Sequence, residues 1–177
     1  MNTELNAVCP YFTMYPLDFP LRVLPDNLRG KAWVFDPFCG RGTTNFAARL
    51  KGLPSVGFDS SPVATAIASA KLVNTTFEEV VRCAELVLNE ARDPLDIPRG
   101  PFWEWAFSST TLVQLCRMRE ELIRDHRSPE RQMLRAIVLG ALHGPRCKGL
   151  PSYFSNQCPR TFAPSLVMRL SFGRSDT

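Results

Sequence analysis

The sequence has few of the residues that metal sites and catalytic triads require. Its two histidines, His126 and His143, have no triad partner or second metal ligand at a suitable spacing. Its six cysteines form no C-x-x-C pair, so we predict no metal site. We expect reduced and mostly buried thiols instead, as in a cytoplasmic protein.

Long apolar runs are also lacking. No stretch approaches the roughly 18 residues that a membrane span requires, and residues 1–20 have neither the basic start nor the apolar centre of a secretion signal. We therefore predict no membrane partner and a cytoplasmic location. The 177 residues, 45% of them hydrophobic, suffice for one globular domain. A net charge of +4 permits nucleic-acid binding without demonstrating it.

The most informative stretch predicts a strand, a glycine turn and a helix. Residues 32–35 are apolar and predict a buried strand, and residues 43–50 predict a helix with a threonine near its start. Between them, Gly40 and Gly42 would let the backbone approach a ligand closely. The helix start would offer unpaired N–H groups to an anion. This order is typical of a nucleotide-type binding unit.

An acid ends each of two predicted strands. Asp36 ends the first strand, and a carboxylate there suits a ligand with a cationic end. Asp59 ends the second, about 20 residues past the glycine loop, where an acid usually binds ribose hydroxyls. The alternative role for Asp59 is helix capping, because Asp-Ser-Ser-Pro would also begin the helix near Pro62. The third glycine of the dinucleotide fingerprint is missing, which disfavours a nucleotide-dependent dehydrogenase.

These residues together resemble a known site. The loop D-P-F-C-G-R-G-T-T at 36–44, followed by G-F-D-S-S-P-V-A at 57–64, resembles the S-adenosyl-L-methionine site of the DNA amino-methyltransferases, the cytosine-N4 and adenine-N6 enzymes. Their usual loop reads D-P-F-x-G-S-G-T-T, and Arg41 stands where a serine is common. Residues 11–20 resemble the family segment that closes over the methionine end of the cofactor.

The resemblance implies a role for each matching residue. Asp36 would face the methionine ammonium group, and Asp59 would hold the ribose hydroxyls, with Ser60 near the adenine edge. Thr43 and Thr44 would offer hydroxyl and N–H groups to the methionine carboxylate. The remaining cofactor-binding residues would lie in the loop or in the upstream segment: Pro37, Phe38, Gly40, Gly42 and Thr13. The implied fold is α/β, an incomplete Rossmann-like methyltransferase fold with a helical insertion after the second strand.

We expect a single domain, 1–177, in three parts: a cofactor-binding core at 10–74, a helical insertion at 75–143, and an irregular loop and tail at 144–177. Helices are predicted at 62–74, 76–92, 110–125 and 128–143 from their periodicity and start signals. The aromatic cluster at 102–107 favours a hydrophobic plug over a base-stacking platform, because no basic residue interleaves it. The insertion either braces the fold or shapes a DNA groove.

The third part has the composition of a nucleic-acid contact loop. Glycine and proline exclude regular structure over much of 144–164, and cations alternate there with aromatic rings. The candidate DNA-binding residues are Arg146, Lys148, Tyr153, Asn156 and Arg160. The alternative is a surface loop pinned by its own aromatics. Residues 152–164 also resemble a segment of a subgroup of the methyltransferases, which favours cytosine-N4 as the target. Residues 165–172 predict either a strand or a tail.

The catalytic motif of the family is missing. That motif is an Asp, Asn or Ser followed by Pro-Pro and an aromatic residue, which accepts hydrogens from the exocyclic amine and stacks on the flipped base. No Pro-Pro occurs in this chain. We therefore predict a site-specific DNA methyltransferase of the restriction-modification type that is truncated or split, whose catalytic motif either lies on a second polypeptide or is lost. This chain alone is expected to be weak or inactive. Two alternatives stay open, an inactive S-adenosylmethionine-binding module and a methyltransferase acting on RNA or another substrate.

Overall fold

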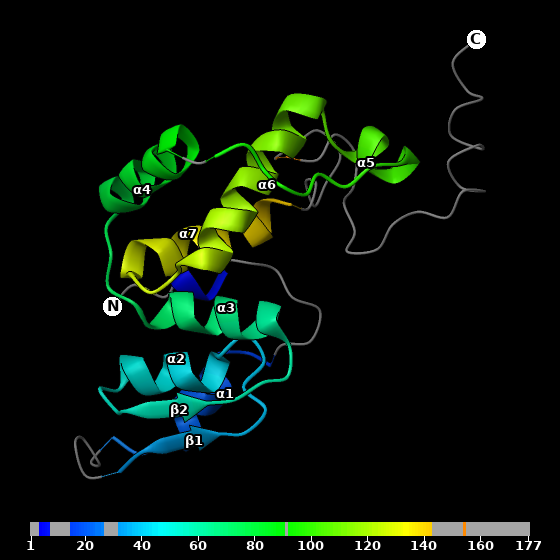
Figure 1. The fold of residues 1–177 in the computed structure, drawn as a ribbon. Coiled ribbons are helices and arrows are strands. Elements are labelled where there is room, and N and C mark those ends of the chain that lie inside the picture. The colour runs from blue at the N-terminus through cyan, green and yellow to red at the C-terminus, as the bar shows by residue number, and fades with distance from the viewer. Residues whose placement is uncertain (1–3, 8–14, 27–31, 91, 143–153, 155–177) are drawn as a thin grey trace.

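The computed structural model describes residues 4–7, 15–26, 32–90, 92–142 and 154. A two-stranded parallel sheet lies at one end of the molecule, two helices lie next to it, and a group of helices extends beyond them (Figure 1). The chain is thus a helix-rich mixed α/β protein. Within the described residues, no helix is long and apolar enough to span a bilayer.

The sheet pairs β1 (Val34–Asp36) with β2 (Ser55–Gly57), and α2 (Thr43–Leu50) connects them. Residue Phe35 pairs with Val56, and Asp36 pairs with Gly57. The predicted strand–turn–helix unit is therefore confirmed, with the first strand beginning at 34 rather than 32. The prediction that this strand is buried is wrong, because one face of the sheet is uncovered and Phe35 is 63% exposed there. Parallel pairing brings the carboxyl ends of both strands, and the acids that follow them, to the same edge of the sheet.

The two faces of this sheet differ. Helix α2 contacts both strands on one face, where a Cβ on Gly57 would lie 2.8 Å from the Asn45 Oδ1 atom of α2. Because side chains alternate along a strand, Phe35, Val56 and Phe58 point to the opposite face. They are 63%, 38% and 58% exposed, and the rings of Phe35 and Phe58 meet edge to face at 6.0 Å. No helix of the described part of the chain covers this bare sheet face.

Helix α3 (Pro62–Leu72) begins where its start signal predicts. Ser61 caps it by accepting the Ala64 N–H at 3.3 Å, and Pro62 occupies the first helical position. Four alanines alternate along α3, a pattern that would also suit packing against a sheet. They are buried, but the main neighbours of α3 are α2 and α7, so α3 lies between the sheet unit and the helical unit.

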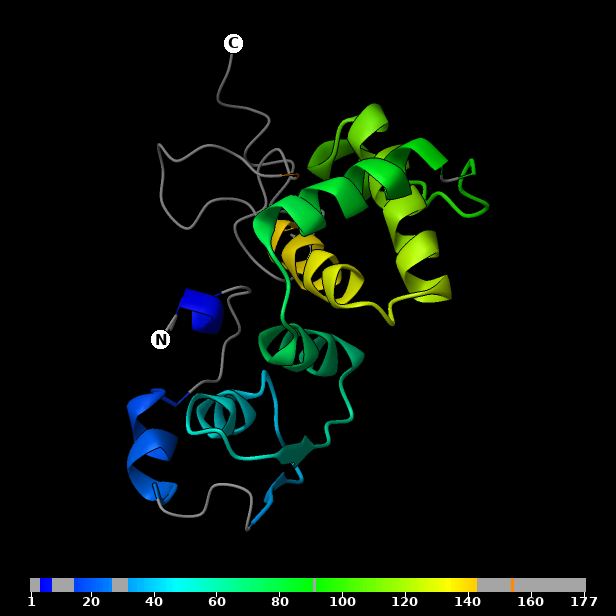
Figure 2. The same cartoon turned by 90° about the vertical axis from the view of Figure 1, so that its left-hand side faces the viewer.

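The described residues after 75 are helical, as predicted: they contain α4 (Phe77–Glu90), α5 (Pro101–Ala106), α6 (Ser109–Arg124) and α7 (Pro129–Ala141) and no strand. Figure 2 shows these helices grouped on the side of α3 away from the sheet. Helices α4, α6 and α7 share a core that includes Val80, Cys83, Val87, Met118, Leu122, Met133 and Leu134. Helix α5 packs its aromatic side chains against Ala106, Phe107 and Leu115, so the predicted hydrophobic plug is confirmed.

The N-terminal part contains a short helix, α1 (Asp18–Val23), with a proline inside it. Proline usually opposes a helix because it lacks an N–H and crowds the preceding turn. Pro20, however, is the third residue of α1, where backbone N–H groups have no intrahelical acceptor in any case. It is also the buried residue of this short helix, which packs on α2.

Low pH is expected to destabilise the start of α4. The Thr76 N–H donates to Glu79 Oε2 at 2.8 Å, and the Glu79 N–H donates to Thr76 Oγ1 at 3.2 Å, which forms a capping box. The Thr76 N–H and then the Thr75 hydroxyl hold the pKa of Glu79 below its ordinary value of 4.5. A depressed folded-state pKa stabilises the protein above pH 4.5, and this stabilisation is lost as the pH falls through the folded value. Urea unfolding midpoints, measured from above pH 4.5 down to low pH, should depend less on pH in Glu79→Gln than in the unsubstituted chain.

Candidate functional site

The glycine turn between β1 and α2 uses its two glycines differently. Both have positive φ, +50° at Gly40 and +73° at Gly42, which other residues adopt only with strain. A Cβ on Gly42 would lie 2.7 Å from the Ala68 Cβ atom of α3, whereas a Cβ on Gly40 would meet nothing within 4 Å. Gly42 therefore permits close packing of the turn on α3, and Gly40 faces open space.

Asp59, which follows β2, is hydrogen-bonded to this turn. Its Oδ2 atom accepts the Gly40 N–H at 2.9 Å, and its Oδ1 atom accepts the Ser61 N–H at 2.8 Å. The helix-capping alternative for Asp59 is wrong, because Ser61 is the residue that caps α3. An ionised carboxylate has about four acceptor positions, so Asp59 retains acceptor capacity after these two bonds.

Asp36 lies at the same edge. Its Oδ1 atom accepts the Phe38 N–H at 3.2 Å, and the backbone continues the parallel pairing past both strands through Phe58 N–H to Asp36 C=O at 3.0 Å. Burial raises the pKa of the Cys39 thiol, and the charges of Asp36 and then Asp59 raise it further. Both carboxylates therefore act on the same buried thiol.

The Cys39 thiol is expected to resist alkylation at neutral pH. Its pKa lies above the ordinary value of 9.0, and the thiolate is the reactive form. Iodoacetamide labelling followed by peptide mass spectrometry should show slow modification in the folded chain and rapid modification in urea. Asp36→Asn removes one of the two opposing charges and should speed labelling of the folded chain. Fast labelling of the native protein at neutral pH would contradict this account of the turn.

The start of α2 carries partial positive charge, opposite in sign to the Asp36 and Asp59 carboxylates. The first N–H groups of a helix have no intrahelical acceptor and carry partial positive charge. Thr43 is buried, and Thr44 is half-buried, with its hydroxyl hydrogen-bonded to the Tyr15 hydroxyl. Tyr15, which precedes α1, therefore reaches the start of α2. Pro37, Phe38 and Ser60 are exposed, with Phe38 at 87%.

Several predicted site residues lie outside the described part of the chain. They are the cofactor candidate Thr13 and the DNA-binding candidates Arg146, Lys148, Tyr153, Asn156 and Arg160. The residues that the structure brings together are the loop glycines, both acids and the start of α2. Among the described residues, no group of three or more His, Cys, Asp or Glu side chains could hold a metal ion.

The sequence prediction missed Asn45. It lies in the first turn of α2 and is 2% exposed, and neither Asn45 Oδ1 nor Nδ2 has a hydrogen-bond partner. Buried amides are normally paired, so this side chain is unusual. It borders Gly57 and therefore lies beneath the end of β2. The sequence signal that could have identified Asn45 is its position as a polar residue directly before the apolar run Phe46–Ala48.

Comparisons with known proteins add no relative. No family model matches the chain, and neither a curated protein nor a solved structure matches it. Function must therefore follow from the chemistry of the site.

Proposed function

We propose that this chain is the S-adenosyl-L-methionine-binding part of a DNA amino-methyltransferase with a Rossmann-like fold. One observation carries the proposal: Asp36 ends β1, Asp59 follows the paired parallel strand β2, and the two carboxylates flank a glycine turn that is bonded to Asp59. Ligands of open α/β sheets bind outside the carboxyl ends of the strands, which is where both acids lie.

The charges suit the amino-acid end of the cofactor. An α-amino acid is a zwitterion, and Asp36 offers a negative charge to its ammonium group while the start of α2 offers N–H groups to its carboxylate. A dinucleotide would instead place a pyrophosphate at this turn, close to two acids. The pair of acids thus favours a ligand that carries positive charge over a phosphorylated one.

Asp59 suits the ribose. Two of its acceptor positions are used by the Gly40 and Ser61 N–H groups, and the others can accept ribose hydroxyls. Gly40 leaves open space on the turn into which a ligand could fit. When bound, S-adenosylmethionine supplies a methyl group on a positively charged sulfur. The residues of this chain would bind and orient it.

A second polypeptide is expected to complete the enzyme. Sheets made only of parallel strands normally have both faces covered, whereas β1 and β2 expose Phe35, Val56 and Phe58 on the bare sheet face. The sequence also lacks the Pro-Pro-aromatic motif. Both features support a split enzyme whose partner covers this face and contributes the catalytic residues that contact the target base.

A methyl-transfer assay tests the proposal. The chain should bind S-adenosylmethionine but transfer little methyl to mixed-sequence DNA, and turnover should appear when the product of a neighbouring reading frame that encodes a Pro-Pro-aromatic motif is added. Robust turnover by the 177-residue chain alone would contradict the split arrangement. Binding without turnover in every combination would favour the inactive module. RNA in place of DNA tests the remaining alternative.

A further inference from the structure

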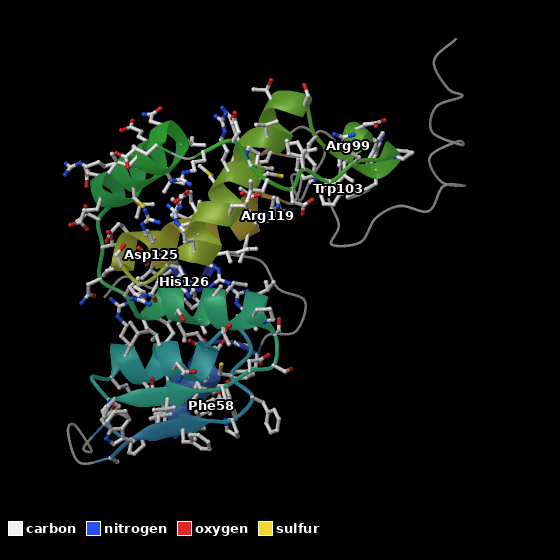
Figure 3. The ribbon with its side chains drawn as sticks, viewed as in Figure 1. Phe58, Arg99, Trp103, Arg119, Asp125 and His126 are labelled. Carbon is white, nitrogen blue, oxygen red and sulfur yellow. The ribbon has the colours of Figure 1, made fainter. Side chains whose placement is uncertain are left out.

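A polar pocket lies away from the glycine turn, where the helical unit meets α3. Its volume is about 110 Å³, and it is lined by Thr65, Ala66 and Ser69 of α3, by His126, and by Gln132 and Arg135 of α7. His126 lies between the helical unit and α3 (Figure 3). At about 30 Å³ per water molecule, the pocket has room for roughly three to four waters, a size that suits a small polyatomic ion.

Arg135 is the unusual arginine of this unit. The other arginines of α6 and α7 each contact an oxygen: Arg117 contacts Asp93, Arg119 contacts Asp96 and Glu120, Arg124 contacts Glu121, and Arg131 contacts the Asp125 carbonyl. Arg135 is half-buried and makes no such contact within the described residues. A partly desolvated guanidinium with free donors is best satisfied by an oxyanion, which it can bind with two parallel hydrogen bonds.

The rest of the lining also supplies donors. The Ser69 hydroxyl has no hydrogen bond with another described residue. Gln132 Nε2 uses one N–H on the Arg127 carbonyl at 3.0 Å and keeps a second. His126 Nδ1 lies 3.2 Å from the Leu122 carbonyl, which can only accept, so the Nδ1 proton is used there and adds no donor to the pocket. Thr65 donates its hydroxyl to the Ser61 and Pro62 carbonyls and so adds no donor.

No carboxylate lines the pocket. The neighbouring Asp125 is exposed, and its Oδ1 atom accepts the Arg127 N–H at 3.1 Å. We propose that this pocket is a binding site for a tetrahedral oxyanion of the phosphate class, held by the Arg135 guanidinium with Ser69 and Gln132 as further donors. The site does not depend on the cofactor turn or on the proposed methyl transfer.

The test uses inorganic phosphate as the probe and amide NMR as the readout. Titration of phosphate into the chain, against sodium chloride at equal ionic strength, should shift the signals of Ser69 and His126 saturably. Arg135→Gln should weaken this binding roughly tenfold or more, since charge-assisted hydrogen bonds are the stronger ones. Arg127→Gln is the matched control, because it removes the same charge nearby from an exposed side chain and should leave binding unchanged.

A second variant keeps the test decisive if Arg135→Gln unfolds. Ser69→Ala removes one donor, and it should weaken phosphate binding by a smaller factor. A short DNA duplex distinguishes the source of the anion: shifts at Ser69 and His126 that phosphate competes away indicate a backbone phosphate, and a response to phosphate alone indicates a free anion. Equal responses to phosphate and chloride, or equal losses in Arg135→Gln and Arg127→Gln, would overturn the proposal.

Discussion

Asp59→Ala is expected to weaken S-adenosylmethionine binding by about 100-fold. Hydrogen bonds to charged groups contribute about 1.5–3 kcal/mol each, and the proposed site uses the Asp59 carboxylate both for ribose hydroxyls and for the Gly40 N–H that positions the turn. The loss is therefore expected to be larger than that from Asp36→Ala, whose carboxylate accepts one bond within the turn, from Phe38 N–H. Isothermal titration calorimetry measures both.

Glu85→Ala is a suitable control for that experiment. Glu85 is an exposed acid on α4, outside the cofactor turn, so its removal changes the net charge equally without touching the site. Circular dichroism should confirm that each variant is folded before the titration. A folded Asp59→Ala chain that binds the cofactor as well as Glu85→Ala does would show that the acid has no role in binding.

Gly42→Ala is expected to destabilise the fold by about 3 kcal/mol. A left-handed backbone costs a non-glycine residue roughly 1–2 kcal/mol, and overpacking adds about 1–3 kcal/mol. Overpacking applies here because the new Cβ would lie 2.7 Å from the Ala68 Cβ atom and 2.9 Å from its Cα atom. Urea denaturation measures the change in the free energy of unfolding.

Gly40→Ala separates the two contributions. Gly40 also has positive φ, at +50°, but a Cβ there meets open space. Its substitution should therefore cost only the backbone strain, about 1–2 kcal/mol. Equal losses of stability at the two glycines would mean that the turn does not pack on α3 as described.

The sequence predicts local structure well where a local signal exists. The bounds of α2 match the prediction at both ends, and α3, α4 and α7 begin at or next to residues with start signals, such as Ser61-Pro62 and the Thr76–Glu79 capping box. These signals work because each satisfies N–H groups that every helix leaves unpaired. The β1–α2–β2 order and the shared edge of the two acids follow from the same local pattern.

The sequence predicts packing partners poorly. Alanines on α3 indicate a close neighbour but do not identify it, and that neighbour proved to be α2 and α7. Pro20 disfavours a helix locally, yet its place in the first turn makes α1 possible. The buried Asn45 and the pocket at Arg135 each depend on residues distant in the sequence, so local patterns could not predict them.

The most direct test of the central claim is an amide NMR titration of the chain with S-adenosylmethionine. The account predicts saturable one-to-one binding, with the largest shifts at Gly40, Thr44 and Asp59 and little change in α4 and α6. An absence of saturable shifts, or shifts confined to residues away from the β1–α2 turn, would contradict it.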